Sequence, residues 1–215
     1  MKTGKQIGLR VLCLLIGYFL GCILTADIVA KKHTGKSAAH VGETGNPGMA
    51  NIMEALGFKA GIIVLAGDLL KTTAACLLSL GLAGGAIGRI AALYAGLGAA
   101  LGHNFPFWRK WKGGKGVTVT CMALPLFSIP WGLLSDIIGA LVVIVTGYLS
   151  IGGVVIPAVF TLIAFLLFGV EAGILGLLYT MMMVQRHYSK LKQIPTGECT
   201  KYDIIGLIRG KLGKS

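Results

Sequence analysis

The sequence predicts an all-α membrane protein with about seven transmembrane or half-spanning helices, its N-terminus outside and its C-terminus in the cytoplasm. Of its 215 residues, 55% are hydrophobic and only 13% are charged, about half the charged share of an average soluble domain. The mean hydropathy is +0.80, and long apolar runs alternate with short polar connectors. So few charged side chains cannot cover a soluble globule, which excludes soluble enzymes, disordered chains and coiled coils.

The first apolar run covers residues 7–30 and is expected to form one uncleaved helix. Lys2, Lys5 and Arg10 lie at its start, as basic residues precede the apolar core of a signal peptide. We interpret the run as a membrane span because several further apolar runs follow it.

Three further apolar runs follow, at residues 52–83, 87–101 and 117–184. The last is almost wholly apolar, with breaks near residues 125–132, near residues 148–153 and at Glu171. Four helices of roughly 17 residues each, the lower limit for spanning a bilayer, fit this length and these breaks. Most of the 33 glycines are expected to let neighbouring helices approach closely.

Three segments are rich in lysine and arginine: residues 31–36, residues 109–115 and the C-terminal tail. Basic residues accumulate in short cytoplasmic loops, so all three segments are expected on the cytoplasmic side. An even number of crossings then separates them, which gives seven spans and an external N-terminus. The basic residues at the start of the first run argue against this orientation. We expect a single polytopic domain over residues 1–200 and a basic cytoplasmic tail at residues 201–215.

The net charge of +12 is explained first by basic loops that stay on the cytoplasmic side of the membrane. It also favours an anionic substrate or lipid headgroups as partners. The basic residues are scattered among loops, so nucleic acid is not an expected partner. The five cysteines show no Cys-x-x-Cys spacing and no histidine at ligand spacing, so no metal site is expected. They are Cys13, Cys22, Cys76, Cys121 and Cys199.

A glycine-rich loop at residues 44–51 precedes the second run on the expected cytoplasmic face. Glycines there let successive backbone N–H groups point the same way at a helix N-terminus, which suits a phosphate. The alternative is a turn that only starts the next helix, and the loop taken alone favours that turn. The candidate contacts are Thr44, Gly45, Asn46, Gly48 and Asn51.

A second glycine-rich loop, residues 112–116, leads directly into the last run. Flexible backbone, a lysine and a helix N-terminus again suit a phosphate. The loop is not a Walker A motif, because no serine or threonine follows Lys115. A basic turn that only holds topology is an equally weighted alternative. The candidate contacts in and before this loop are His103, Asn104, Gly113, Gly114 and Lys115.

Two ionisable residues, Asp68 and Lys71, lie inside the second apolar run at positions i and i+3, so they share one helix face. An ionisable group within a span is a functional hypothesis by default. The slightly favoured alternative is that the two residues form an ion pair with a purely structural role. His187 lies at the end of the last run, where a lone histidine is more often a hydrogen-bonding surface group than a base.

Together these loops resemble the integral-membrane glycerol-3-phosphate acyltransferases that use acyl-phosphate as the donor. The most specific match is the family's Gly-His-x-x-Pro followed by Lys-Gly-Gly-Lys-Gly, which stands intact at residues 102–106 and 112–116. The first family loop, roughly Gly-Ser-Gly-Asn-x-Gly-Ala-Thr-Asn, is matched at residues 44–51, with Thr44 in place of the serine.

Weaker matches extend the resemblance, in the right order, from the first helix to Glu198. An Asp-x-x-Lys of the family matches Asp68 and Lys71. A Tyr-x-Ser matches residues 148–150, and an Arg-His pair matches residues 186–187. The seven-span count of the family agrees with the count obtained from the charge pattern.

The resemblance implies transfer of a fatty acyl group from acyl-phosphate to the 1-hydroxyl of glycerol 3-phosphate, giving lysophosphatidate for phospholipid synthesis, without a cofactor. It also implies a multi-pass protein of a bacterial plasma membrane with its site on the cytoplasmic face. Lys115 and His187 are the expected catalytic residues, His187 as a positioning group or proton acceptor. Ser150 is an expected secondary contact of the substrate, and Asp68 and Lys71 have supporting roles.

Two departures from the family pattern keep another interpretation open. Glu54 stands where the family has an arginine, and Ser189 and Lys190 replace a glutamate and an asparagine of the last motif. A glutamate near a phosphate replaces attraction with repulsion. The alternative is therefore a non-catalytic paralogue that binds lipid or phosphate. A small transporter is a third possibility, but the sequence shows no internal repeat to support it.

Overall fold

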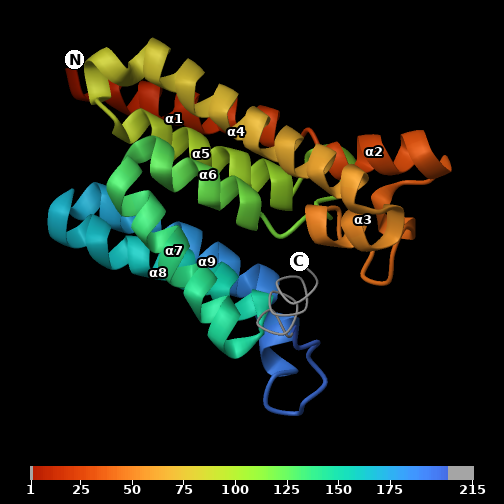
Figure 1. The fold of residues 1–215 in the computed structure, drawn as a ribbon. Coiled ribbons are helices and arrows are strands. Elements are labelled where there is room, and N and C mark those ends of the chain that lie inside the picture. Colours follow the sequence, from red (N-terminus) through yellow and green to blue (C-terminus); the bar gives the residue numbers. More distant parts are fainter. Residues whose placement is uncertain (1, 203–215) are drawn as a thin grey trace, which may run out of the picture. The chain divides into compact units, whose positions relative to one another are not determined.

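A computed structural model describes residues 2–202, and within them it contains helices, turns and loops but no strand (Figure 1). The predicted all-α fold is therefore confirmed. Of the predicted basic tail, residues 203–215 lie outside the described residues. The α-helices are α1 (Lys2–Gly21), α2 (Thr25–Thr34), α3 (Met49–Leu56), α4 (Phe58–Ile87), α5 (Ile90–Asn104), α6 (Val117–Phe127), α7 (Ile129–Thr146), α8 (Leu149–Leu167) and α9 (Val170–Lys192).

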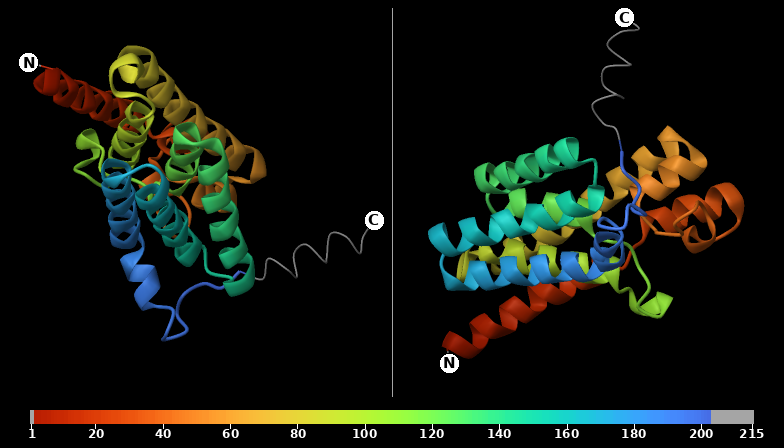
Figure 2. Two further views of the ribbon diagram at one scale, coloured as in Figure 1. Left: turned by 90° about the vertical axis from the view of Figure 1, so that its left-hand side faces the viewer. Right: turned by 90° about the horizontal axis from the view of Figure 1, so that it is seen from below.

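The chain divides into two compact units, Met1–Ile129 and Pro130–Ser215, named here unit one and unit two. Unit one contains α1 to α6, and unit two contains nearly all of α7, with α8 and α9. The single domain expected over residues 1–200 stays a prediction. Figure 2 shows both units from two further sides.

In unit one, α1 packs against α5 with backbone touching backbone. Gly17 of α1 lies against the backbone of Ala95, and Gly98 of α5 lies against the carbonyl oxygen of Leu14, so a Cβ added at either glycine would overlap these atoms. Small residues fill α5, and most of the helix is buried. This is the close approach expected of glycine in membrane helices, where association depends on van der Waals contact rather than on hydrophobic burial.

The first apolar run forms two helices, α1 and α2, and not the single helix expected. Trp108 donates from Nε1 to the carbonyl oxygen of Cys22 at 2.9 Å, and Lys71 donates from Nζ to that of Ile23 at 2.8 Å. A break within an apolar run is stable only when such freed carbonyls find donors. Both donors come from distant parts of the chain, so the local pattern could not predict the break.

The second run divides at Gly57, whose φ of +89° ends the short α3 and starts the 30-residue α4. Glycine adopts that conformation without steric cost. In the last run, Ser128, Gly147 and Gly169 lie between consecutive helices from α6 to α9. The structure has helices α6 to α9 in this run, with breaks near the expected ones. With 11 residues, α6 is shorter than the roughly 17 expected, and that each helix crosses the membrane stays a prediction.

Unit two is held together by close contacts between consecutive helices. Gly139 of α7 lies against Ile156 of α8, and Gly176 of α9 lies against Thr161 of α8. The hydroxyls of Thr161 and Thr180 are 3.0 Å apart, which adds a polar link between α8 and α9. Figures 1 and 2 show the three helices side by side.

Four segments of the described chain are long and apolar enough to cross a membrane: Thr3–Thr34, Phe58–Ile87, Ile129–Thr146 and Leu149–Leu167. Large apolar side chains on them stay exposed, with Leu166 at 82% and Val145 at 79%, as expected of residues that face lipid. The 11 residues of α6 give about 16 Å of helix, roughly half of a bilayer core of about 30 Å. The number of spans and their orientation stay predictions.

Candidate functional site

In unit one, the first glycine-rich loop folds around the side chain of Asn51, which is 3% exposed. Its Oδ1 accepts hydrogen bonds from the hydroxyl of Thr44 at 2.8 Å and from the Thr44 amide at 3.3 Å. Its Nδ2 donates to the carbonyl oxygen of Val41 at 2.7 Å. Gly42, with φ +71°, leaves no room for a Cβ beside Asn51. Asn51 therefore shapes the loop from inside, whereas the sequence suggested a direct substrate contact.

The outer part of this loop consists of Thr44, Asn46 and Gly48. The Asn46 amide donates to the Thr44 hydroxyl at 3.3 Å, and the Gly48 amide donates to the Asn46 carbonyl oxygen at 2.8 Å. Gly48 is the N-cap of α3, so the first N–H groups of that helix, which have no intrahelical acceptor, begin beside Thr44. Glu54 lies on the same helix and is exposed.

Asp68 and Lys71 form the expected pair, with Lys71 Nζ 2.7 Å from Asp68 Oδ1. Lys71 Nζ also lies 2.9 Å from His103 Nδ1 on α5. Together with its bond to the Ile23 carbonyl oxygen, this makes Lys71 the centre of a buried network that joins the α1–α2 break, α4 and α5. An ammonium donates, so Nδ1 of His103 acts as the acceptor and the neutral ring carries its proton on Nε2. The pairing was predicted, but the participation of His103 was not.

The backbone N–H groups of Gly113 and Gly114 are used within the fold. They donate to the carbonyl oxygens of Asn104 at 3.0 Å and of His103 at 2.9 Å. A Cβ at Gly113 would overlap the His103 carbonyl, and a Cβ at Gly114 would overlap the His103 ring. The sequence suggested that these two amides face a phosphate, and the structure corrects this: the glycines are needed for close packing against α5.

Beyond these glycines, Lys115 and Gly116 lead into α6. Gly116, with φ +74°, is the N-cap of α6, and the half-buried Lys115 directly precedes it. The carboxamide of Asn104 packs against Gly116. Within the described residues its Oδ1 and Nδ2 have no hydrogen-bond partner, although Asn104 is fully buried. A cation beside a helix N-terminus on a fixed loop is an arrangement suited to a phosphate group.

In unit two, Ser150 and His187 are both buried, at 6% and 3% exposed. Ser150 lies in the first turn of α8, and its hydroxyl has no hydrogen-bond partner within the described residues. His187 Nδ1 lies 2.9 Å from the carbonyl oxygen of Met183. A carbonyl oxygen only accepts, so Nδ1 of His187 is the donor in this hydrogen bond. His187 is thus a buried, oriented group and not the surface histidine that its position alone favoured.

Sequence reasoning missed a set of contacts that hold the aromatic and basic loop before Lys112. Arg109 Nε lies 3.4 Å from Asp27 Oδ2, and the Ala38 amide donates to Asp27 Oδ1 at 2.7 Å. Tyr18 donates from its hydroxyl to the Phe105 carbonyl oxygen at 3.0 Å. An aspartate inside the first apolar run was the available signal, because buried carboxylates need partners.

Comparison with known proteins supplies the family. A family model described as glycerol-3-phosphate acyltransferase matches residues 11–197. Glycerol-3-phosphate acyltransferase 1 of Lactobacillus johnsonii is 40% identical over 200 residues, which cover 93% of this chain and 96% of the relative. The protein of the same name from Lactobacillus acidophilus is 35% identical over 204 residues, covering 95% and 97%. The chain belongs to the glycerol-3-phosphate acyltransferase family.

Two solved structures share the fold of this family member. They are crystal structures of PlsY (YgiH), an integral membrane glycerol 3-phosphate acyltransferase, in its glycerol 3-phosphate and lysophosphatidic acid forms. The TM-scores are 0.79, over 93% of this chain and 98% of that chain, and 0.76, over 89% and 94%. Sequence identity is 24% in both cases, so these matches are evidence for the fold alone.

The family membership confirms the resemblance predicted from the two glycine-rich loops. As a member of the glycerol-3-phosphate acyltransferase family, the chain is an acyltransferase of lipid biosynthesis. Its four helical segments long and apolar enough to cross a membrane identify it as a membrane protein. Within the described residues, no group of three or more His, Cys, Asp or Glu side chains is placed to hold a metal ion.

Proposed function

We propose that this protein transfers a fatty acyl group from acyl-phosphate to the 1-hydroxyl of glycerol 3-phosphate, giving lysophosphatidate, at the cytoplasmic face of a bacterial plasma membrane. The main support is the junction of α5, the second glycine-rich loop and α6. There, Lys115 precedes a helix N-terminus on a loop fastened to His103 and Asn104. The names of its relatives support glycerol 3-phosphate as the acceptor.

The proposed reaction is a single acyl transfer. The 1-hydroxyl oxygen forms the new ester bond with the acyl carbon, and the bond from that carbon to the phosphate oxygen breaks. Inorganic phosphate leaves with the electron pair of the broken bond, and the hydroxyl proton passes to Nε2 of His187. Because the donor is already activated, the protein works mainly by positioning two anions and balancing their charge.

Each candidate residue has a role in this proposal. Lys115 and the α6 N-terminus bind one phosphate, and Thr44 with the α3 N-terminus binds another. Among residues 2–202, the polar side-chain atoms of Ser150 and Asn104 have no hydrogen-bond partner. This supports their role as substrate contacts, because buried polar groups in proteins rarely stay unpaired. The residues that support these contacts from within the fold are Gly45, Asn46, Gly48, Asn51, Asp68, Lys71, His103, Gly113 and Gly114.

A non-catalytic paralogue that binds lipid or phosphate is the second candidate. It is favoured by one specific observation, Glu54 in place of the family's arginine. The glutamate lies on α3, the same helix whose N-terminus follows Thr44. Its negative charge opposes binding of an anion at that helix.

Product formation separates the two candidates. Purified full-length protein in lipid nanodiscs is incubated with palmitoyl-phosphate and radiolabelled glycerol 3-phosphate, and lysophosphatidate and inorganic phosphate are measured. Acyl transfer predicts equal amounts of the two products. Palmitoyl-coenzyme A in place of palmitoyl-phosphate tests the donor and is expected to give no product. Absence of lysophosphatidate with both donors, from protein that still binds glycerol 3-phosphate, would show that the enzyme proposal is wrong.

A further inference from the structure

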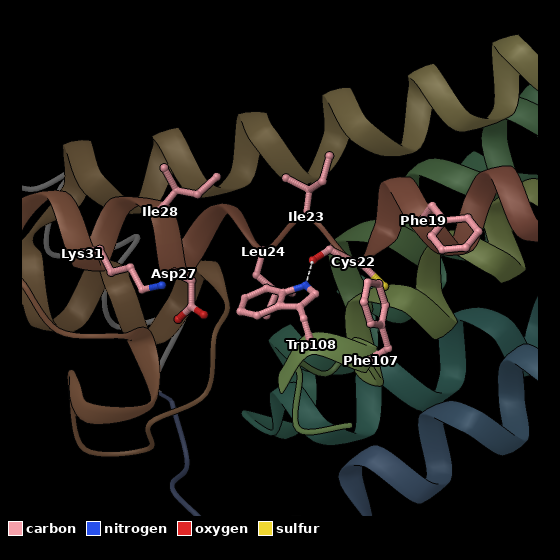
Figure 3. Close-up of a pocket in the computed structure, with 9 residues that line it drawn as sticks. All are labelled: Phe19, Cys22, Ile23, Leu24, Asp27, Ile28, Lys31, Phe107 and Trp108. Atoms are coloured by element: carbon pink, nitrogen blue, oxygen red, sulfur yellow. Dashed lines mark hydrogen bonds between the residues drawn. The ribbon is translucent and has the colours of Figure 1, made fainter. Parts of the chain in front are cut away.

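An open cavity of about 430 Å³ lies in unit one beside the break between α1 and α2 (Figure 3). This volume falls within the roughly 300–1,000 Å³ typical of ligand sites. The wall opposite the break comes from Phe107 and Trp108, just before the second glycine-rich loop. None of the phosphate or proton-transfer candidates, Thr44, Lys115 or His187, lines it. The cavity is therefore a feature separate from the proposed acyl-transfer site.

One end of the cavity is apolar. Phe19 of α1 and Ile23 of the break line this end, and both side chains are exposed. Both residues belong to Thr3–Thr34, a segment long and apolar enough to cross a membrane. Trp108 uses its indole N–H on the Cys22 carbonyl oxygen at 2.9 Å, so its aromatic face remains as the apolar wall. These surfaces suit a hydrocarbon chain.

The other end is cationic. Figure 3 shows Lys31 and Asp27 at the end of the cavity opposite Phe19 and Phe107. Asp27 is neutralised by Arg109, 3.4 Å away, and also accepts from the Ala38 amide. The exposed Lys31 lines the same end, where the positive charges of Lys31 and Arg109 outnumber the single negative charge of Asp27. The charge favours a phosphate, so the cavity has the polarity of a phospholipid along its length.

We propose that this cavity binds an anionic phospholipid of the bilayer, with an acyl chain against Phe19, Ile23 and Trp108 and the headgroup phosphate at Lys31. A resident bilayer lipid fits better than a substrate because the cavity shares no residue with the phosphate loops and because its apolar residues lie on a membrane-spanning segment. Binding of this lipid does not require the protein to catalyse acyl transfer.

Tryptophan fluorescence tests the proposal directly. Full-length protein carrying Trp111→Phe and Trp131→Phe keeps Trp108 as its only tryptophan. It is reconstituted in phosphatidylcholine nanodiscs that contain increasing fractions of lipid brominated on the acyl chains, either phosphatidylglycerol or phosphatidylcholine. Brominated phosphatidylglycerol is expected to quench Trp108 at an about fivefold lower fraction, since one lysine near an anionic headgroup contributes roughly 1 kcal/mol.

Two neighbouring lysines provide matched variants. Lys31→Gln is expected to abolish the preference for phosphatidylglycerol, whereas Lys32→Gln, which removes the same charge from a residue outside the cavity, is expected to keep it. If the tryptophan variant fails to fold, native mass spectrometry of the otherwise unsubstituted protein counts bound phosphatidylglycerol for the same two lysine changes. Equal quenching by both lipids, or equal losses in both lysine variants, would overturn the proposal. Displacement of the lipid by a non-hydrolysable acyl-phosphonate would overturn it too, because the cavity would then be a substrate site.

Discussion

At the scale of single residues, the ring of His187 is buried and held in one orientation. The Met183 carbonyl oxygen holds Nδ1–H at 2.9 Å, so Nε2 is the nitrogen that can accept a proton. The histidine is 3% exposed, and this limits its exchange with solvent. Both features fit a general base better than a surface hydrogen-bonding group.

The substitution His187→Asn separates the orienting hydrogen bond of the side chain from its proposed role as a base. The asparagine amide keeps a donor near the Met183 carbonyl oxygen but removes the basic nitrogen. We expect kcat to fall by about 100-fold or more, the usual contribution of a general base, with little change in KM for glycerol 3-phosphate. The thermal midpoint of the detergent-solubilised protein is the control for folding. A variant with near-normal kcat would exclude His187 as the base.

Lys115 is tested against Lys112, the other lysine of the same loop. Lys115 is half-buried next to the α6 N-terminus, whereas Lys112 is exposed. Lys115→Gln is expected to raise KM for glycerol 3-phosphate about tenfold, because a charge-assisted hydrogen bond contributes roughly 1.5–3 kcal/mol. Lys112→Gln is expected to change KM only slightly. Equal effects of the two substitutions would indicate general attraction of anions rather than a specific contact.

At the scale of elements, Lys71 joins three parts of unit one. Its ammonium contacts the carboxylate of Asp68 in α4, the ring of His103 in α5 and the carbonyl oxygen of Ile23 at the α1–α2 break. His103 in turn accepts the Gly114 amide at its carbonyl oxygen. The position of the second glycine-rich loop therefore depends on a charged network in the second apolar run.

Loss of Lys71 is expected to destabilise the protein strongly. Lys71→Met removes the ammonium group 2.7 Å from the 2% exposed Asp68 and leaves His103 Nδ1, at 3.7 Å, beside that carboxylate. Breaking a buried ion pair in this way costs about 3–5 kcal/mol. The double variant Asp68→Asn, Lys71→Met removes both charges and is expected to recover part of the loss. Lys59→Met, at an exposed position of the same helix, is the control. Thermal unfolding in detergent measures the stability of all three variants. If Lys71→Met were as stable as Lys59→Met, a structural role for Lys71 would be contradicted.

Some element boundaries followed from the sequence and others did not. The breaks between α6, α7, α8 and α9 fall at Ser128, Gly147 and Gly169, close to the polar and glycine interruptions visible in the last run. The break between α1 and α2 left no comparable local signal. It depends on Trp108 and Lys71, which satisfy carbonyl oxygens far away in sequence.

At the scale of the whole molecule, the net charge of +12 and the apolar composition set the expected topology. Cysteine labelling tests it after the five native cysteines are replaced by alanine. In intact cells, a membrane-impermeant maleimide is expected to label Gly4→Cys but neither Lys36→Cys nor Thr196→Cys, because basic segments stay in the cytoplasm. Permeabilised cells provide the control, in which all three positions react. Labelling of Lys36→Cys in intact cells would reverse the predicted orientation.

The sequence by itself determined that this protein is an all-helical membrane protein and which family it belongs to. Composition and hydropathy are sums over many residues, and the family motifs are short stretches of neighbouring residues. Both can therefore be recognised without knowing how the helices pack. Only the tertiary structure decided how the polar groups are used. It assigned Asn51 to shaping a loop, Gly113 and Gly114 to packing against His103, and Lys71 to three partners. The physical reason is that most buried donors and acceptors are paired, and the partners of these groups lie far apart in the chain.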